Sequence, residues 1–223
     1  MGDVIGQILP QAVGVAISPI PIIAAILMLL SPKARVTSVG FLLGWVLGIV
    51  IATTVFTLLS SVLPQGDDGG SKPIQGIIQL LLGAGLLLLA IGQWRKRPKD
   101  GEEPAMPKWM QAIDKITFPV ALGLGFLLSA INPKNLLMTA GAGVTIGSAS
   151  LGGGDITLVI AIFTIIAAST VLIPVIGYLF AAEKLRGTLD ALRVWLTKEN
   201  AVIMAVLLLV IGVQMIGKGI GSF

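Results

Sequence analysis

The sequence predicts an all-α integral membrane protein with six transmembrane helices, arranged as two inverted three-helix repeats with broken first and fourth helices. Its 223 residues are 55% hydrophobic and only 12% charged, and the mean hydropathy is +0.98. A water-soluble domain could not carry this composition on its surface. Apolar stretches of roughly 20 residues recur about six times, each long enough to cross a hydrocarbon core of about 30 Å. Proline-containing motifs interrupt the first and fourth stretches at matching places.

The expected spans are separated by polar segments. They cover residues 5–30, 36–62, 74–94, 118–147, 155–180 and 200–220. Runs of leucine at 80–82 and 207–209 exclude the alternation of apolar and polar residues that strands of a membrane barrel show. Between the last two spans, apolar residues recur at helical spacing and predict a surface helix over residues 183–200: Leu185, Leu189, Leu192 and Trp195.

Basic residues fall mainly on one side of this arrangement. The first, third and fifth loops carry Lys33, Arg35, Arg95, Lys96, Arg97, Lys99, Lys108, Lys115, Lys184, Arg186, Arg193 and Lys198, whereas the opposite side carries Lys72 and Lys218. By the positive-inside rule, these loops face the cytoplasm and both termini lie outside the inner (plasma) membrane. The net charge of +4 is thus explained by basic residues that set the membrane topology. Because these residues already have a role, no nucleic acid is expected as a partner.

The long third loop divides the chain into a first repeat at residues 1–94, a cytoplasmic linker at 95–117 and a second repeat at 118–223. Because each repeat crosses the membrane an odd number of times, the second enters from the opposite side, which is the geometry of an inverted repeat. Superimposed at an offset of about 114 residues, Ser18-Pro19 coincides with Asn132-Pro133. Paired breaks of this kind indicate a transporter binding site.

Both breaks expose backbone polar groups at membrane depth. A proline removes one donor and clashes with the carbonyl four residues earlier, so neighbouring helices or a wet cavity must satisfy the freed groups. In the first span, Pro10 and then the Pro19-Pro21 pair are expected to open the helix twice. The candidate substrate-binding residues are Ser18, Pro19, Pro21, Asn132, Pro133, Lys134 and Asn135.

Lys134 is the charged residue that does not fall at the end of a span. An ammonium at the bilayer centre costs about 2.5–3.5 kcal/mol on insertion scales, so Lys134 is expected to face a cavity or the protein interior. No aspartate or glutamate lies inside a span to pair with it. Two interpretations follow: Lys134 binds an anionic substrate group, or it is satisfied by carbonyls that the prolines free.

The sequence contains no cysteine and no histidine, which excludes disulfides, thiolate or imidazole metal sites and the usual catalytic triads. No metal ion or other cofactor is expected. A nucleophile and base pair formed by Ser18 and Lys134 lacks an evident oxyanion site, so we expect that the protein is not an enzyme. Gly40, Gly44 and Gly48 follow the small-xxx-small pattern of close helix packing, within one chain or between two, and leave a homodimer open.

Two motifs carry a resemblance to a known group. Pro19-Ile20-Pro21 and Asn132-Pro133-Lys134 are similar to motifs of the lysine-exporter (LysE) superfamily, small six-helix transporters with a Pro-Gly-Pro type break and an Asn-Pro-Lys motif. Residues 9–22 and 40–45 look most like the actinobacterial GAP family, which is associated with moving peptidoglycolipids or sulfolipids to the cell surface. The resemblance implies an exporter whose site lies between the first and fourth helices. Isoleucine at position 20, where amino-acid exporters usually have glycine, argues against a small amino-acid substrate.

The leading functional hypothesis is therefore a transporter or exporter that moves an anionic or amphipathic lipid or glycolipid toward the cell surface. Membrane lipids, and an anionic head group in particular, are the expected partners. Export of amino acids or other small polar, anionic or zwitterionic solutes is one alternative. A non-transporting membrane scaffold of a lipid-synthesis or secretion complex is the other.

Overall fold

The computed structural model describes residues 1–62, 73–97, 113 and 115–223. Within these ranges the protein is almost entirely helical and has no strand. Most of the expected linker at 95–117, including Lys99 and Lys108, lies outside the described residues, as does Lys72.

The helices follow the expected spans. α1 (Gly2–Ala16) and α2 (Pro19–Leu30) correspond to the first span, α3 (Ala34–Ser61) to the second and α4 (Pro73–Arg95) to the third. α5 (Phe118–Phe126), the π-helix η2 (Leu127–Ile131) and α6 (Pro133–Gly147) correspond to the fourth, and α7 (Gly153–Ile220) contains the last two. α3, α4 and α7 are long and apolar enough to cross a membrane, and the two bent helix pairs raise the number of candidate spans to as many as five.

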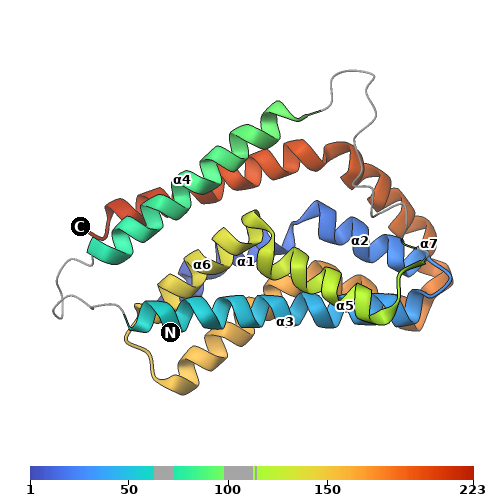
Figure 1. The fold of residues 1–223 in the computed structure, drawn as a ribbon, viewed down its shortest axis with the longest axis horizontal. Coiled ribbons are helices and arrows are strands. Elements are labelled where there is room, and N and C mark those ends of the chain that lie inside the picture. The colour runs from blue at the N-terminus through green and yellow to red at the C-terminus, as the bar shows by residue number, and fades with distance from the viewer. Residues whose placement is uncertain (63–72, 98–112, 114) are drawn as a thin grey trace.

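α7 is too long to be one straight span. Its 68 residues would extend about 100 Å as a straight helix, against a hydrocarbon core of about 30 Å. Ala181 has non-helical backbone angles (φ −142°, ψ 44°), and α7 turns back so that its last part runs beside α4 (Figure 1). Pro174 lies inside the helix, seven residues before this kink. The expected surface helix over 183–200 forms part of the turn.

Both predicted breaks are present. α1 and α2 meet at 51° around Ile17-Ser18, and the helix preceding Asn132 meets α6 at 60°. The expected opening at Pro10 is wrong, because α1 continues through Pro10 without interruption. The carbonyl that Pro10 leaves without a donor belongs to Gly6, an exposed residue near the start of the helix, so it does not have to be satisfied in the interior.

The glycine stripe of α3 packs within the chain. A Cβ on Gly40 would lie 2.9 Å from the Phe118 carbonyl oxygen, and one on Gly44 would lie 3.0 Å from the Phe126 nitrogen. Across the same contact, a Cβ on Gly125 would lie 2.8 Å from the Trp45 nitrogen. The absence of side chains therefore lets the backbones of α3 and α5 approach closely, as the small-xxx-small pattern predicts.

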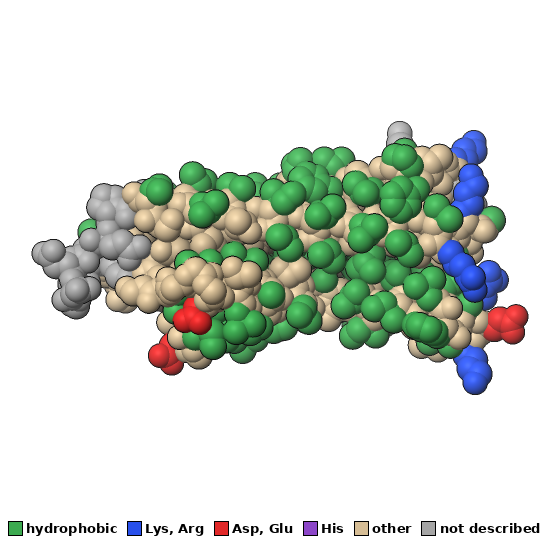
Figure 2. Space-filling view, turned by 90° about the horizontal axis from the view of Figure 1, so that it is seen from below, with side chains coloured by type: hydrophobic (Ala, Val, Ile, Leu, Met, Phe, Trp, Pro, Cys, Tyr) green, Lys and Arg blue, Asp and Glu red, His purple; other side chains and the backbone are tan. Residues whose placement is uncertain are grey.

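The surface is apolar along its length and basic at one end. Leu81, Leu88 and Ile173 are each more than 60% exposed, which is expected where lipid tails rather than water surround a protein. Hydrophobic side chains cover the middle of the face shown in Figure 2, and Lys and Arg gather at one end of it, which we call the basic end. Both termini lie toward the opposite end (Figure 1). The chain is thus an all-helical membrane protein.

Candidate functional site: two helix breaks in contact

The two breaks meet in the interior of the molecule. Lys134 Nζ lies 2.5 Å from Ser18 Oγ and donates to it, although the two residues are 116 positions apart in the sequence. Ser18 Oγ also lies 3.1 Å from Asn135 Oδ1. Ser18, Lys134 and Asn135 are 2%, 4% and 0% exposed, so this polar cluster is sealed from the surroundings in this conformation.

The first break frees two carbonyls, and side chains satisfy both. The α-helical partner of the Val15 carbonyl would be the amide of residue 19, which is a proline; Ser18 Oγ donates to this carbonyl instead, at 2.7 Å. The partner of the Ile17 carbonyl would be the amide of residue 21, also a proline. Lys134 Nζ takes that place from the other repeat, at 3.3 Å.

The second break arises from a change of helical register. The Asn132 amide bonds to Leu127 O, five residues back, at 3.1 Å, so Leu128 O loses the donor that an α-helix would provide. Asn135 Nδ2 supplies a donor to Leu128 O at 2.8 Å. Asn132 Oδ1 accepts from the Lys134 amide at 3.1 Å and so caps the N-terminus of α6.

One partner of the site was not anticipated from the sequence. Thr170 on α7 donates from Oγ1 to the Ala16 carbonyl at 2.5 Å, which ties α7 to the first break. A single threonine in an apolar helix carries no signal that distinguishes it from threonines such as Thr164, which bonds back to its own helix at Ile160 O.

The candidate residues therefore have different structural roles. Ser18, Lys134 and Asn135 form the polar cluster itself, while Asn132 caps α6. Pro19 and Pro21 are buried and lack the backbone donors that a continuous helix would use, whereas Pro133 is exposed. Among the described residues, no carboxylate forms an ion pair with Lys134, and the salt bridge found there joins Arg193 and Asp190. The Lys134 ammonium donates to two neutral oxygens, and an anionic oxygen would bind it more strongly than either.

Three surface pockets lie apart from Lys134. The basic pocket, about 550 Å³, is at the start of α3 and the kink of α7, and its lining includes Lys33, Arg35, Tyr178 and Arg186. The polar pocket, about 500 Å³, lies between the ends of α1, α4, α6 and α7. No group of metal-binding side chains occurs in the part of the chain that the structure describes.

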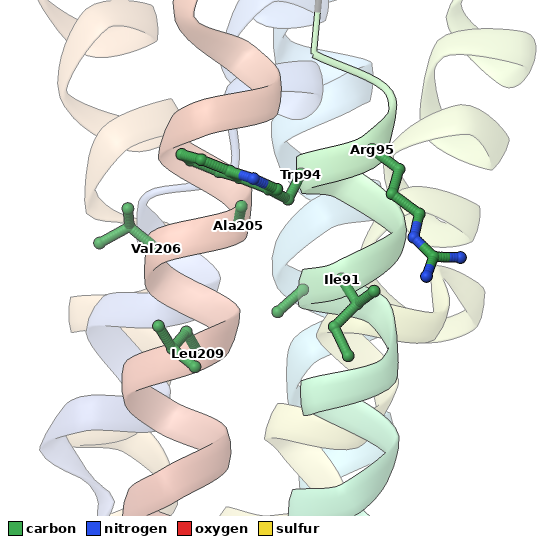
Figure 3. Close-up of a pocket in the computed structure, with 7 residues that line it drawn as sticks. Ile91, Trp94, Arg95, Ala205, Val206 and Leu209 are labelled. Carbon is green, nitrogen blue, oxygen red and sulfur yellow. The ribbon is translucent and has the colours of Figure 1, made fainter.

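The third pocket, which we call the apolar groove, separates α4 from the last part of α7. It has a volume of about 330 Å³ and is lined by Ala90, Ile91, Trp94, Arg95, Ala205, Val206 and Leu209. Trp94 reaches from α4 toward α7, while the Arg95 side chain points away from α7 (Figure 3). The guanidinium of Arg97 stacks over the Trp94 ring, 4.2 Å from its centroid. Aromatic and basic residues of this kind mark the interface between lipid tails and head groups.

Comparison with known proteins gives one match. The family model described as "Sap, sulfolipid-1-addressing protein" (SfLAP) matches residues 8–221, nearly the whole chain and both helix breaks. Comparison with curated proteins and with solved structures gave no significant match. The match supports the resemblance to the GAP family and a lipid-related role in the membrane. The chain belongs to the sulfolipid-1-addressing protein (SfLAP) family.

Proposed function

We propose that the protein is a membrane transporter that moves an anionic lipid or glycolipid toward the cell surface through a site between its two broken helices. The observation that carries the proposal is the environment of Lys134. A buried ammonium without a carboxylate partner joins two interrupted helices that come from different halves of the chain. The family description, which names a sulfolipid, supports a sulfolipid-like substrate.

The proposal includes a six-span topology. We take the two parts of α7 on either side of Ala181 as separate crossings, because one straight helix of this length exceeds the membrane thickness several times. Each half of the chain then has three crossings, and because three is an odd number the halves have inverted orientations. The basic end faces the cytoplasm and both termini lie outside the plasma membrane.

Transport requires the two breaks to separate. Opening of the interface removes Lys134 from the Ile17 carbonyl and Ser18, and a sulfate or other anionic head group replaces them. Because an anionic group adds the attraction of opposite charges to its hydrogen bonds with the ammonium, the anion stabilises the open form. Closing on the other side restores the neutral contacts and releases the head group. No covalent step is involved, so the protein acts as a carrier and not as an enzyme.

The surface features suit a lipid substrate better than a soluble one. The basic pocket at the basic end offers Lys33, Arg35 and Arg186 to an anionic head group before transport. The apolar groove provides a surface on which acyl chains remain in contact with the bilayer while the head group crosses. Few charges inside the protein are then needed.

A reconstitution experiment tests the proposal. Purified protein is inserted into liposomes that contain fluorescently labelled sulfatide, a sulfated glycolipid, and dithionite quenches the label in the outer leaflet. Transport makes inner-leaflet label accessible, so the quenched fraction rises above the value for protein-free liposomes. Labelled galactosylceramide, which lacks only the sulfate, measures how much of the effect depends on negative charge.

The alternatives give other outcomes. Efflux of a trapped solute such as lysine without movement of sulfatide supports a solute exporter. If neither lipid nor solute moves, and the protein co-purifies with a lipid-synthesis complex, a scaffold is supported. Either result contradicts the proposed lipid transport.

A further inference from the structure

The polar pocket differs from its apolar surroundings in composition. Gln7 of α1, Gln75 and Gln79 of α4, Thr145 of α6 and Lys218 of α7 line it. The residues that line it belong to the starts of α1 and α4 and the ends of α6 and α7, which lie toward the end of the molecule at which both termini are found (Figure 1). A volume of about 500 Å³ falls within the usual range for small-molecule sites.

Two glutamines in this pocket have amide atoms without partners. Gln75 and Gln79 are only 2% and 7% exposed, and neither Gln75 Nε2, Gln75 Oε1 nor Gln79 Oε1 has a hydrogen-bond partner among the described residues. Buried polar groups are normally satisfied, because leaving one unpaired costs about 1–3 kcal/mol. The two residues are one helical turn apart, so they present their amides on the same side of α4.

The pocket also contains a positive charge. Lys218 Nζ donates to the Gln7 carbonyl at 2.6 Å, which fixes the ammonium at the pocket wall and accounts for one of its three protons. Among the described residues, no acidic side chain lines the pocket. The described residues of the site thus combine the Lys218 ammonium with amide groups that can both donate and accept.

From this combination we infer a binding site for a polyhydroxylated head group that carries one negative charge, such as the sulfated sugar of a glycolipid. Neighbouring sugar hydroxyls, each a donor and an acceptor, match the free amides of Gln75 and Gln79, and the anionic group is bound by Lys218. A phosphate head group without a sugar satisfies the cation but leaves the amides unpaired. This site is separate from Lys134, and binding to it does not require transport.

Native mass spectrometry of the intact protein in a sugar-free detergent tests the inference, with short-chain sulfatide, galactosylceramide and phosphatidylglycerol as probes. We expect sulfatide to bind most tightly and the double variant Gln75→Leu/Gln79→Leu to weaken it at least tenfold. Gln93→Leu, on the same helix but outside the pocket, is the matched control and should bind as the wild type does.

Two further measurements separate binding from folding. Because the substitutions remove unpaired amides, the double variant should keep or raise the thermal midpoint Tm of the ligand-free protein. Lys218→Met should reduce the preference for sulfatide over galactosylceramide and leave galactosylceramide binding unchanged. Equal sulfatide binding by the double variant overturns the inference, and so does binding of phosphatidylglycerol as tight as that of sulfatide. If the wild-type protein binds sulfatide but does not move it across liposomes, that result would contradict only the proposed function.

Discussion

Replacement of Lys134 should separate the stability of the protein from its transport activity. Lys134→Met keeps much of the side-chain volume and removes the ammonium. The substitution leaves the Ile17 carbonyl and Ser18 without that donor, at a cost of about 1–3 kcal/mol. It also removes a buried charge whose insertion costs about 2.5–3.5 kcal/mol. These terms largely offset each other, so the free energy of unfolding should change by no more than about 2.5 kcal/mol.

Transport, in contrast, should be abolished, because a thioether cannot bind an anionic head group. The dithionite assay with sulfatide measures this loss, and thermal unfolding in detergent measures stability. Lys134→Ala should also abolish transport while the protein still inserts and folds, with a lower Tm than Lys134→Met because truncation adds a cavity. Lys198→Ala, an exposed lysine outside the site, is the matched control. Transport by Lys134→Met at the wild-type rate would refute the assignment, and a collapse of its folded state would show that the ammonium is needed for structure.

The remaining predictions concern packing and hydrogen bonds around the breaks. Gly125→Leu should destabilise the protein by at least about 1–3 kcal/mol and so lower Tm, because even a Cβ there would meet the α3 backbone. Gly123→Leu should leave Tm unchanged, because the space around Gly123 is open. Asn135→Leu should destabilise the protein by about 1–3 kcal/mol, since Leu128 O loses its donor, whereas Asn200→Leu, which removes an unpaired Oδ1, should not; equal Tm values for the two variants would contradict this account. Thr170→Val should cost about 0.6 kcal/mol, an average value for membrane hydrogen bonds, and Thr170→Ser should restore the stability.

Much of the fold could be predicted from the sequence because a membrane restricts the choices. The span limits came from runs of apolar residues, and the breaks from prolines that remove defined donors. The opening at Pro10 was predicted wrongly, since proline sequence alone does not reveal whether the freed carbonyl, here of Gly6, is exposed. In α7, too, a proline does not locate the break. The helix continues through Pro174, and the residue with non-helical backbone angles is Ala181.

The candidate site was predictable in outline and not in its contacts. Asn-Pro-Lys in an apolar span identified Lys134, and the sequence left open whether it meets a substrate or carbonyls. In the structure Lys134 donates to the Ile17 carbonyl, a contact that depends on how distant helices pack. The polar pocket was missed, although Gln75 and Gln79, four residues apart near the start of an apolar span, were a visible signal. Lys218 lies across from them only after the chain has folded back.

The contact between the breaks also has a consequence for biogenesis. The Ile17 carbonyl receives its donor from a residue 117 positions later. While a ribosome delivers the chain to the translocon, the N-terminal helices enter the bilayer long before Lys134 has been synthesised. Until Lys134 has been inserted, the Ile17 carbonyl must therefore be hydrated or bound by the insertion machinery. The native contact at the first break can form only after the second break has been synthesised.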